Sequence, residues 1–168
     1  MKEVLIRPIC HEDNPSIATL IRSVLEDLGV PKTGTALADK SLDNLFEFYM
    51  QPRSVYFVVL ADDRLLGGGG IGPLQGGPEA VCELQKMYFA KSLRGKGIGR
   101  MLLQQLLDRA KEFGYRTCYL ETMPYMEAAR NLYRQFGFEY LKDPMGDTGH
   151  NSCQVWMCKN LDSFKAQE

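Results

Sequence analysis

The stretch Leu93–Arg100, L-R-G-K-G-I-G-R, joins a strand-like run to a helix-like run. Its three glycines allow a tight turn and a close approach of the backbone to a ligand. The amides of such a turn and of the first helical turn lack partners, and the positive end of the helix dipole lies behind them. The sequence therefore predicts an anion site, suited to a diphosphate, to which Arg94, Lys96 and Arg100 add positive charge.

Two other diphosphate motifs are alternatives. The phosphate loop of the nucleotide triphosphatases requires Ser or Thr after Gly-Lys, and Lys96 is followed by Gly97, which excludes that motif. The dinucleotide fingerprint requires a third glycine where Arg100 stands. Its acidic residue, about twenty positions further on, has a counterpart in Glu121. A dinucleotide-binding oxidoreductase is thus a distant alternative.

Hydrophobic periodicity predicts a sheet with interspersed helices. The expected strands are 4–9, 55–60, 65–74, 81–89, 117–122, 138–141 and 153–159. The expected helices are 14–28, 41–49, 99–113 and 126–136. This order, β-α-α-β-β-β-α-β-α-β-β, contains one clear parallel crossover through the helix 99–113. The four glycines at 67–70 are expected to weaken a strand and to mark a bulge or a close backbone approach.

The composition excludes several classes of function. The 168 residues fit a single domain, 1–168, and 45% apolar with 24% charged residues is usual for a globular protein. A net charge of -1 gives no basis for nucleic-acid binding. No apolar run approaches the roughly 20 residues of a membrane span, so no membrane contact is expected. Five cysteines without a C-x-x-C pair, and a start without a signal-peptide core, favour a cytoplasmic protein.

Three segments together resemble one enzyme family. They are L-x-K-M-Y-F at 84–89, R-x-x-G-x-G at Arg94, Gly97 and Gly99, and N-L-Y-R-Q-F-G-F at 131–138. In this order and spacing they are similar to the Gcn5-related N-acetyltransferases (GNAT) over nearly the whole chain. The resemblance implies an α/β fold with a mixed, mostly antiparallel sheet of six to seven strands. It also implies one parallel β-α-β crossover and helices on both faces.

The resemblance implies acetyl-CoA as the acetyl donor. The pyrophosphate is expected on the glycine turn and the pantetheine arm along the preceding strand, where the Met87 amide is a candidate donor to the carbonyl oxygen. The implied cofactor-binding residues are Met87, Tyr88, Phe89, Arg94, Gly95, Lys96, Gly97, Ile98, Gly99 and Arg100. One position departs from the family: Met126 stands where many members have an asparagine that binds the pantetheine, which leaves that contact open.

Acetyl transfer to an amine needs a base, because a lysine-like amine with a pKa of about 10.4 must lose its proton. Glu83 is the candidate, since a similarly placed glutamate serves some members of the resembling family, often through water. Its side chain is expected on the strand face that also carries Gln85, Met87 and Phe89. The plain alternative is a solvated or salt-bridged carboxylate. Glu121 is the substitute base, or the residue that holds the substrate ammonium.

Tyr133 is the candidate acid, because the tyrosine of L-Y-x-x-x-G-F in the resembling family lies near the acetyl-CoA sulfur. There it can protonate the departing thiolate. No metal is expected, since His150 and Cys153 offer two ligands where zinc takes four, or three with water. His150, in the loop 142–151, is at most a polar contact to the acceptor.

The resulting prediction is an acetyl-CoA-dependent N-acetyltransferase that acts by direct attack in a ternary complex. The acceptor is a primary amine of an unidentified small molecule or protein. A covalent step through Cys118 or Cys153 ranks lower, because no base is recognisable beside either. A non-catalytic acyl-CoA-binding sensor is the alternative from another class. A homodimer is possible if the final strand is exposed and pairs across two copies.

Overall fold

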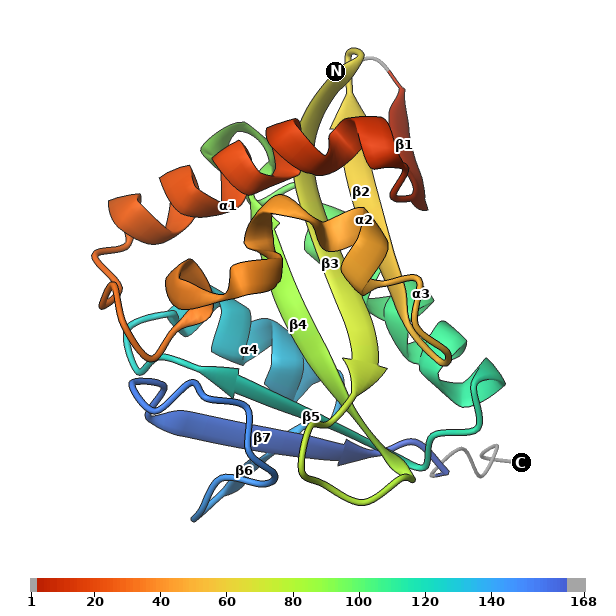
Figure 1. Cartoon of the computed structure of the whole chain (residues 1–168), viewed down its shortest axis with the longest axis vertical. Helices are drawn as coiled ribbons and strands as arrows, with labels where there is room; N and C mark the ends of the chain where they lie inside the picture. Colours follow the sequence, from red (N-terminus) through yellow and green to blue (C-terminus); the bar gives the residue numbers. More distant parts are fainter. Residues whose placement is uncertain (1–2, 163–168) are drawn as a thin grey trace.

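The computed structural model describes residues 3–162 and contains one seven-stranded sheet with helices packed on it (Figure 1). The strand order is β1-β2-β3-β4-β5-β7-β6. The strands are β1 Val4–Pro8, β2 Val55–Ala61, β3 Arg64–Pro73, β4 Val81–Phe89, β5 Thr117–Thr122, β6 Glu139–Leu141 and β7 Val155–Asn160. The α-helices are α1 Asn14–Asp27, α2 Leu45–Phe48, α3 Ile98–Glu112 and α4 Glu127–Gln135.

One pair of strands is parallel. In the described part of the chain, β4 and β5 run in the same direction, and every other neighbouring pair is antiparallel. Helix α3 provides the crossover between them, as a parallel connection requires. The expected mixed, mostly antiparallel sheet with one β-α-β crossover is therefore confirmed.

Helices cover both faces of the sheet (Figure 1). Strand β2 shows how the sequence divides between them, because successive side chains of a strand point to opposite faces. Tyr56 and Val58 pack in the core under α1, whereas Phe57 and Val59 pack in the core under α3. Helix α3 contributes three leucines without exposed surface, Leu102, Leu103 and Leu106. Burial of each contributes about 1.5–3 kcal/mol, which holds the crossover on the sheet.

The second helix is shorter than the sequence predicts. The expected helix 41–49 is a 3-10 turn, Lys40–Asp43, followed by the single turn of α2. The break is at Asn44, whose backbone leaves the helical region with φ -133° and ψ 45°. The side chain of Asn14 binds two adjacent residues of α2: its Oδ1 accepts from the Phe46 backbone amide at 2.9 Å, and its Nδ2 donates to the Glu47 side chain at 2.8 Å. This long-range capping contact competes with a continuous helix.

The final strand is not an edge of the sheet, so that expectation is wrong. Strand β7 pairs with β5 on one side and with β6 on the other, and the edges are β1 and the short β6. A homodimer through an exposed final strand therefore has no basis in this fold.

None of the helices in residues 3–162 is long and apolar enough to cross a membrane. That the whole chain 1–168 forms one domain stays a prediction.

Candidate active site

A cavity of about 960 Å³ opens where β4 and β5 separate. Their parallel pairing covers three residue pairs, of which Glu83–Tyr119 is the last. Beyond Glu83, β4 continues to Phe89 without β5 as a described ladder partner. The cavity is bounded by these two strands, the start of α3, the α1–α2 connection and the loop between β6 and β7. The separation of two strands, rather than any single motif, creates this space.

A β-bulge in β4 determines which side chains face the α1 side of the sheet. Lys86 has a positive φ of 49°, and the register with β3 shifts between Gly68 and Gly70. Gly69 allows the bulge to pack, because a Cβ on Gly69 would lie 2.9 Å from the Cγ of Met87. The bulge that the glycine run predicts is thus present.

The prediction that Glu83, Gln85, Met87 and Phe89 share one face of β4 is wrong, because of the bulge. Gln85 shares the face of Glu83, and their side chains are hydrogen bonded. Met87 and Phe89, however, pack with the core under α3, on the opposite face from Glu83. The extra residue in the strand reverses the alternation that a regular strand would keep.

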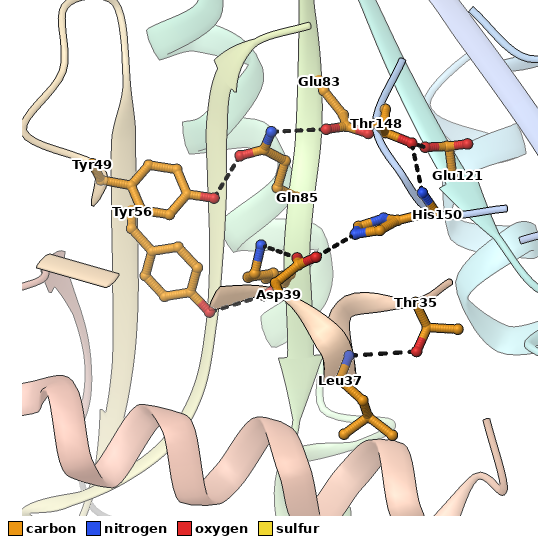
Figure 2. A network of polar contacts seen from close by, with 11 residues as sticks. Thr35, Leu37, Asp39, Tyr49, Tyr56, Glu83, Gln85, Glu121, Thr148 and His150 are labelled. Carbon is orange, nitrogen blue, oxygen red and sulfur yellow. Dashed lines mark hydrogen bonds and ion pairs between the residues drawn. The ribbon is translucent and has the colours of Figure 1, made fainter. Parts of the chain in front are cut away.

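Glu83 is a buried carboxyl with one direct hydrogen-bond donor in the described chain. Its exposed fraction is 6%, and its Oε1 accepts a hydrogen bond of 2.7 Å from the side-chain Nε2 of Gln85. The side-chain Oε1 of Gln85 accepts in turn from the Tyr49 hydroxyl at 2.6 Å (Figure 2). Burial raises the pKa of Glu83 from 4.5 to about 7; the Gln85 bond opposes this shift, and the negative charge of Glu121 adds to it. Such a carboxyl changes charge in the range where a general base operates.

Glu121 lies at the end of β5 and lines the same cavity. The hydroxyl of Thr148 donates to its Oε1, and the same hydroxyl accepts from the His150 amide at 3.2 Å (Figure 2). Two carboxylates from neighbouring strands thus meet in one cavity, as the sequence predicts. Their positions do not by themselves assign the base to one of them.

A second polar group borders Glu83. The Asp39 carboxylate binds the His150 Nε2 at 2.8 Å and the Lys86 ammonium at 2.7 Å. Burial alone would raise the pKa of Asp39, but the bonds from His150 and Lys86 outweigh it and lower the value. Burial alone would lower the pKa of His150, but the Asp39 bond and charge outweigh it and raise the value.

The glycine turn lies at the other end of the cavity. Gly95 and Gly97 have φ angles of 72° and 76°, and the space where each Cβ would stand is open. Gly97 caps α3, whose first amides have no carbonyl one turn earlier within the helix. The open space around these glycines, their positive φ angles and the helix N-terminus together fit the binding of a diphosphate. The turn itself forms as the sequence predicts.

The three basic side chains of the turn differ in position. Arg94 lines the cavity and its guanidinium is bound to the Phe89 carbonyl oxygen at 3.2 Å and 3.3 Å. Lys96 and Arg100 are outside the described cavity lining. Arg100 instead donates to the Gln135 side chain at 2.6 Å. The fold therefore brings one of the three predicted cations to the cavity wall.

Tyr133 is buried on α4 and lines the cavity, with 7% of its surface exposed. Its ring packs against Phe138, with 5.8 Å between the ring centroids. Burial raises the pKa of the Tyr133 phenol, so the hydroxyl keeps its proton at neutral pH. A protonated hydroxyl at the cavity wall is a possible donor to a leaving thiolate.

The cysteine chemistry is unfavourable for a covalent step. Cys153 lines the cavity, but burial and the charge of Glu121 raise the pKa of its thiol to about 12. Cys118 has no exposed surface and lies in the core. Among residues 3–162, no group of three or more His, Cys, Asp or Glu side chains is placed to hold a metal ion.

Asp39, Lys86 and Thr148 are site residues that sequence reasoning missed, and His150 was given only a minor role. Lys86 is part of the L-x-K-M-Y-F segment, which by itself assigns it no role, whereas Asp39, Thr148 and His150 lie in connections of irregular structure outside the three segments. A third polar side chain, Lys86, close to Glu83 and Gln85 in a strand that is otherwise mostly apolar is the one local signal that could have indicated a buried charge pair.

These features, a sheet opened between β4 and β5 with a glycine turn at one end, define a family of acyltransferases. A model of the acetyltransferase (GNAT) family matches residues 21–138. The uncharacterized N-acetyltransferase YjgM of Escherichia coli (strain K12) is 41% identical over 158 residues, which cover 94% of this chain and 95% of that protein. The chain therefore belongs to the acetyltransferase (GNAT) family and is an acyltransferase, which confirms the resemblance.

Solved structures agree on the fold. A GNAT-family acetyltransferase of Staphylococcus aureus Mu50 superimposes with a TM-score of 0.81 at 19% identity, covering 95% of this chain and 99% of that one. YncA, a putative acetyltransferase of Salmonella typhimurium whose structure contains acetyl-CoA, gives a TM-score of 0.76 at 18% identity, with 98% of both chains covered.

Proposed function

We propose that this N-acetyltransferase transfers an acetyl group from acetyl-CoA to a primary amine by direct attack in a ternary complex. The donor is acetyl-CoA, which supplies the acetyl group as a thioester. The observation that carries the proposal is the position of Glu83, a buried carboxyl with a pKa of about 7, in the same cavity as the glycine turn. The acceptor is a small molecule or a protein.

The donor is held by two segments of this chain. The glycine turn Gly95–Gly99 and the first amides of α3 bind the pyrophosphate, with Arg94 beside them. The stretch Met87–Phe89 of β4, which lacks β5 as a ladder partner, pairs through its backbone with the pantetheine arm. The Met87 amide donates to the carbonyl oxygen as negative charge develops there.

Glu83 acts as the general base. The substrate amine arrives as an ammonium, which the negative charges of Glu83 and Glu121 attract. Glu83 then accepts the proton, directly or through a water, because above pH 7 its carboxylate is ionised. Glu121 binds the same substrate ammonium from the neighbouring strand β5. Its oxygen that accepts from Thr148 is fixed in position.

Tyr133 acts as the general acid for the departing thiolate. Tyr133 keeps its proton at neutral pH and donates it to the sulfur as the C–S bond breaks. Because a thiol has an ordinary pKa of about 8.5, below that of the phenol, the phenolate that forms is reprotonated at once from solvent. The raised pKa of Cys153, about 12, supports direct transfer over an acetyl-cysteine step, because a thiol is a poor nucleophile in its protonated form. The five free cysteines support a cytoplasmic location.

The proposal is tested in two stages. Thermal denaturation with acetyl-CoA, CoA or NADH tests the donor: a ligand at about 100 times its Kd stabilises by about 2.7 kcal/mol. We expect a shift with both CoA species and none with NADH. Turnover of a panel of primary amines, followed by release of free CoA thiol, then tests the reaction. No shift with either CoA species refutes the donor site. Donor binding without turnover of any amine supports a sensor instead.

A further inference from the structure

Asp39 joins three segments that are far apart in the sequence. It lies in the connection between α1 and α2, and one of its oxygens binds His150 of the β6–β7 loop, 111 positions away in the chain (Figure 2). Its other oxygen binds Lys86 of the β4 bulge, 47 positions away. The Asp39 and His150 side chains are each 19% exposed, and the Lys86 side chain is 5% exposed. A charge cluster this well shielded from water is held in a fixed geometry.

The loop that carries His150 is fixed on both sides of that residue. Thr148 donates to Glu121, and the Thr148 hydroxyl accepts from the His150 amide. After His150, the Ser152 amide donates to the Gly34 carbonyl at 3.0 Å and its hydroxyl donates to the Thr33 carbonyl at 2.9 Å. The β6–β7 loop is thus tied to β5 and to the α1–α2 connection, so the direction of the imidazole is set by the fold.

Glu83 depends on this arrangement because it is buried beside another carboxylate. Titratable groups from every neighbouring element face Glu83. The two strands contribute Lys86 and Tyr88 of β4 and Cys118, Tyr119 and Glu121 of β5. The other elements contribute Tyr49 after α2 and His150 and Cys153 of the β6–β7 segment, while Asp39 acts through its bonds to Lys86 and His150. Two of these groups are cationic, Lys86 and His150. His150 carries an imidazole, the side chain whose ordinary pKa of about 6.5 lies nearest to neutral pH.

We propose that Asp39 and His150 form a positioning pair, in which Asp39 holds the His150 imidazolium where its charge acts on the carboxylate of Glu83. This inference rests on the proposed role of Glu83 as the base. Glu83, Glu121 and His150 line the same cavity, so the charge of the imidazolium favours the ionised form of Glu83 and opposes the repulsion from Glu121. Against the effect of burial, Asp39 raises the pKa of His150, which favours the imidazolium, and it ties the β6–β7 loop to the α1–α2 connection. The pair therefore extends the pH range in which the base is available.

The pair is tested first in the free protein, by NMR titration. Carboxyl ¹³C shifts report Glu83, whose signal is identified by its loss in Glu83→Gln. In His150→Gln, which keeps a hydrogen-bonding side chain but not the charge, we expect Glu83 to titrate about 0.5 unit higher or more. A fully charged neighbour at 4–6 Å shifts a pKa by about 1–3 units. The matched control is His11→Gln, the only other histidine of the chain, with a side chain 69% exposed.

The two histidines also report the pair directly. The ring C–H signal of His150 should titrate above 6.5 in the wild type and lower in Asp39→Asn, while His11 is unchanged in both. In turnover, the acidic limb of the kcat/KM profile should move to higher pH in His150→Gln but not in His11→Gln, because kcat/KM reports the free enzyme. A purely structural role of His150 would lower the rate without moving this limb.

The outcomes separate the two proposals. If Glu83 titrates at the same pH in His150→Gln as in the wild type, His150 does not act on it and the pair is wrong. If His150 titrates at the same pH in Asp39→Asn as in the wild type, the Asp39 contact does not hold in solution, and the pair is also wrong. If the titrations behave as expected but Glu83→Gln retains full turnover, the pair stands and the role of Glu83 as base fails.

Discussion

Replacing Glu83 by Gln should make the protein more stable at alkaline pH while it impairs turnover. The folded state binds the Glu83 proton more tightly than the unfolded chain does, because burial raises the pKa from 4.5 to about 7. Between these two values the unfolded state has released a proton that the folded state keeps, so stability falls as pH rises through this window. The loss is complete above about pH 7.

The magnitude follows from the width of the window. A difference of 2.5 units, from 4.5 to 7, corresponds to about 3 kcal/mol at 1.36 kcal/mol per unit. A glutamine does not ionise, and its amide oxygen still accepts from Gln85. The variant should therefore gain up to about 3 kcal/mol at pH 8.5. For a chain of this length that is a rise in Tm of about 6 °C or more.

The assay is thermal denaturation at pH 5 and pH 8.5, beside turnover at pH 8.5. The gain in Tm should appear at pH 8.5 and be small at pH 5, where Glu83 is protonated in the folded state. Turnover should fall by about 10²-fold or more, the contribution of a general base. Glu79→Gln, at an exposed glutamate in the β3–β4 turn, is the matched control and should change neither quantity. Equal Tm values for variant and wild type at pH 8.5 would refute the raised pKa, and full turnover would refute the base.

Three further changes test the rest of the site. Tyr133→Phe should lower kcat by about 10²-fold with acetyl-CoA binding unchanged, whereas Tyr140→Phe, at an exposed tyrosine, should not; equal rates exclude the acid. Gly97→Ala and Gly114→Ala, both at positive φ with open space around the Cβ, should each lose about 1–2 kcal/mol of stability. Only Gly97→Ala should also weaken acetyl-CoA binding, by about tenfold. If calorimetry gives the same affinity for acetyl-CoA in Gly97→Ala as in Gly114→Ala, the glycine turn is not a diphosphate site. Cys153→Ala should retain most of the turnover, and its inactivity would revive a covalent step.

The glycine turn and the order of elements were accessible from the sequence because they depend on local patterns. The glycine turn before α3, the apolar stripe of α3 and the β-branched run of β2 each follow from residues close together in the sequence. The single parallel crossover follows from one strand–helix–strand unit. The resemblance to the family pointed to Glu83 and Tyr133, with Glu121 as the substitute base, and all three line one cavity in the structure.

Local patterns failed where a distant segment decides the geometry. The bulge at Lys86 depends on how the glycines of β3 pack against Met87, and it moved Met87 and Phe89 to the face opposite Glu83. The break at Asn44 depends on capping contacts from Asn14. In both cases the deciding contact comes from a segment further away in the sequence than the few residues over which hydrophobic periodicity is judged.

The sequence by itself determined the family and the glycine turn, because these depend on short motifs whose spacing is fixed by helix and strand geometry. Glu83 and Glu121 lie outside those motifs, and their roles stay predictions. The tertiary structure alone decided the environment of Glu83. Its burial, its bond to Gln85 and the cluster of Asp39, Lys86 and His150 beside it bring together residues up to 111 positions apart. A pKa depends on burial and on nearby charges, and only the folded chain places those charges.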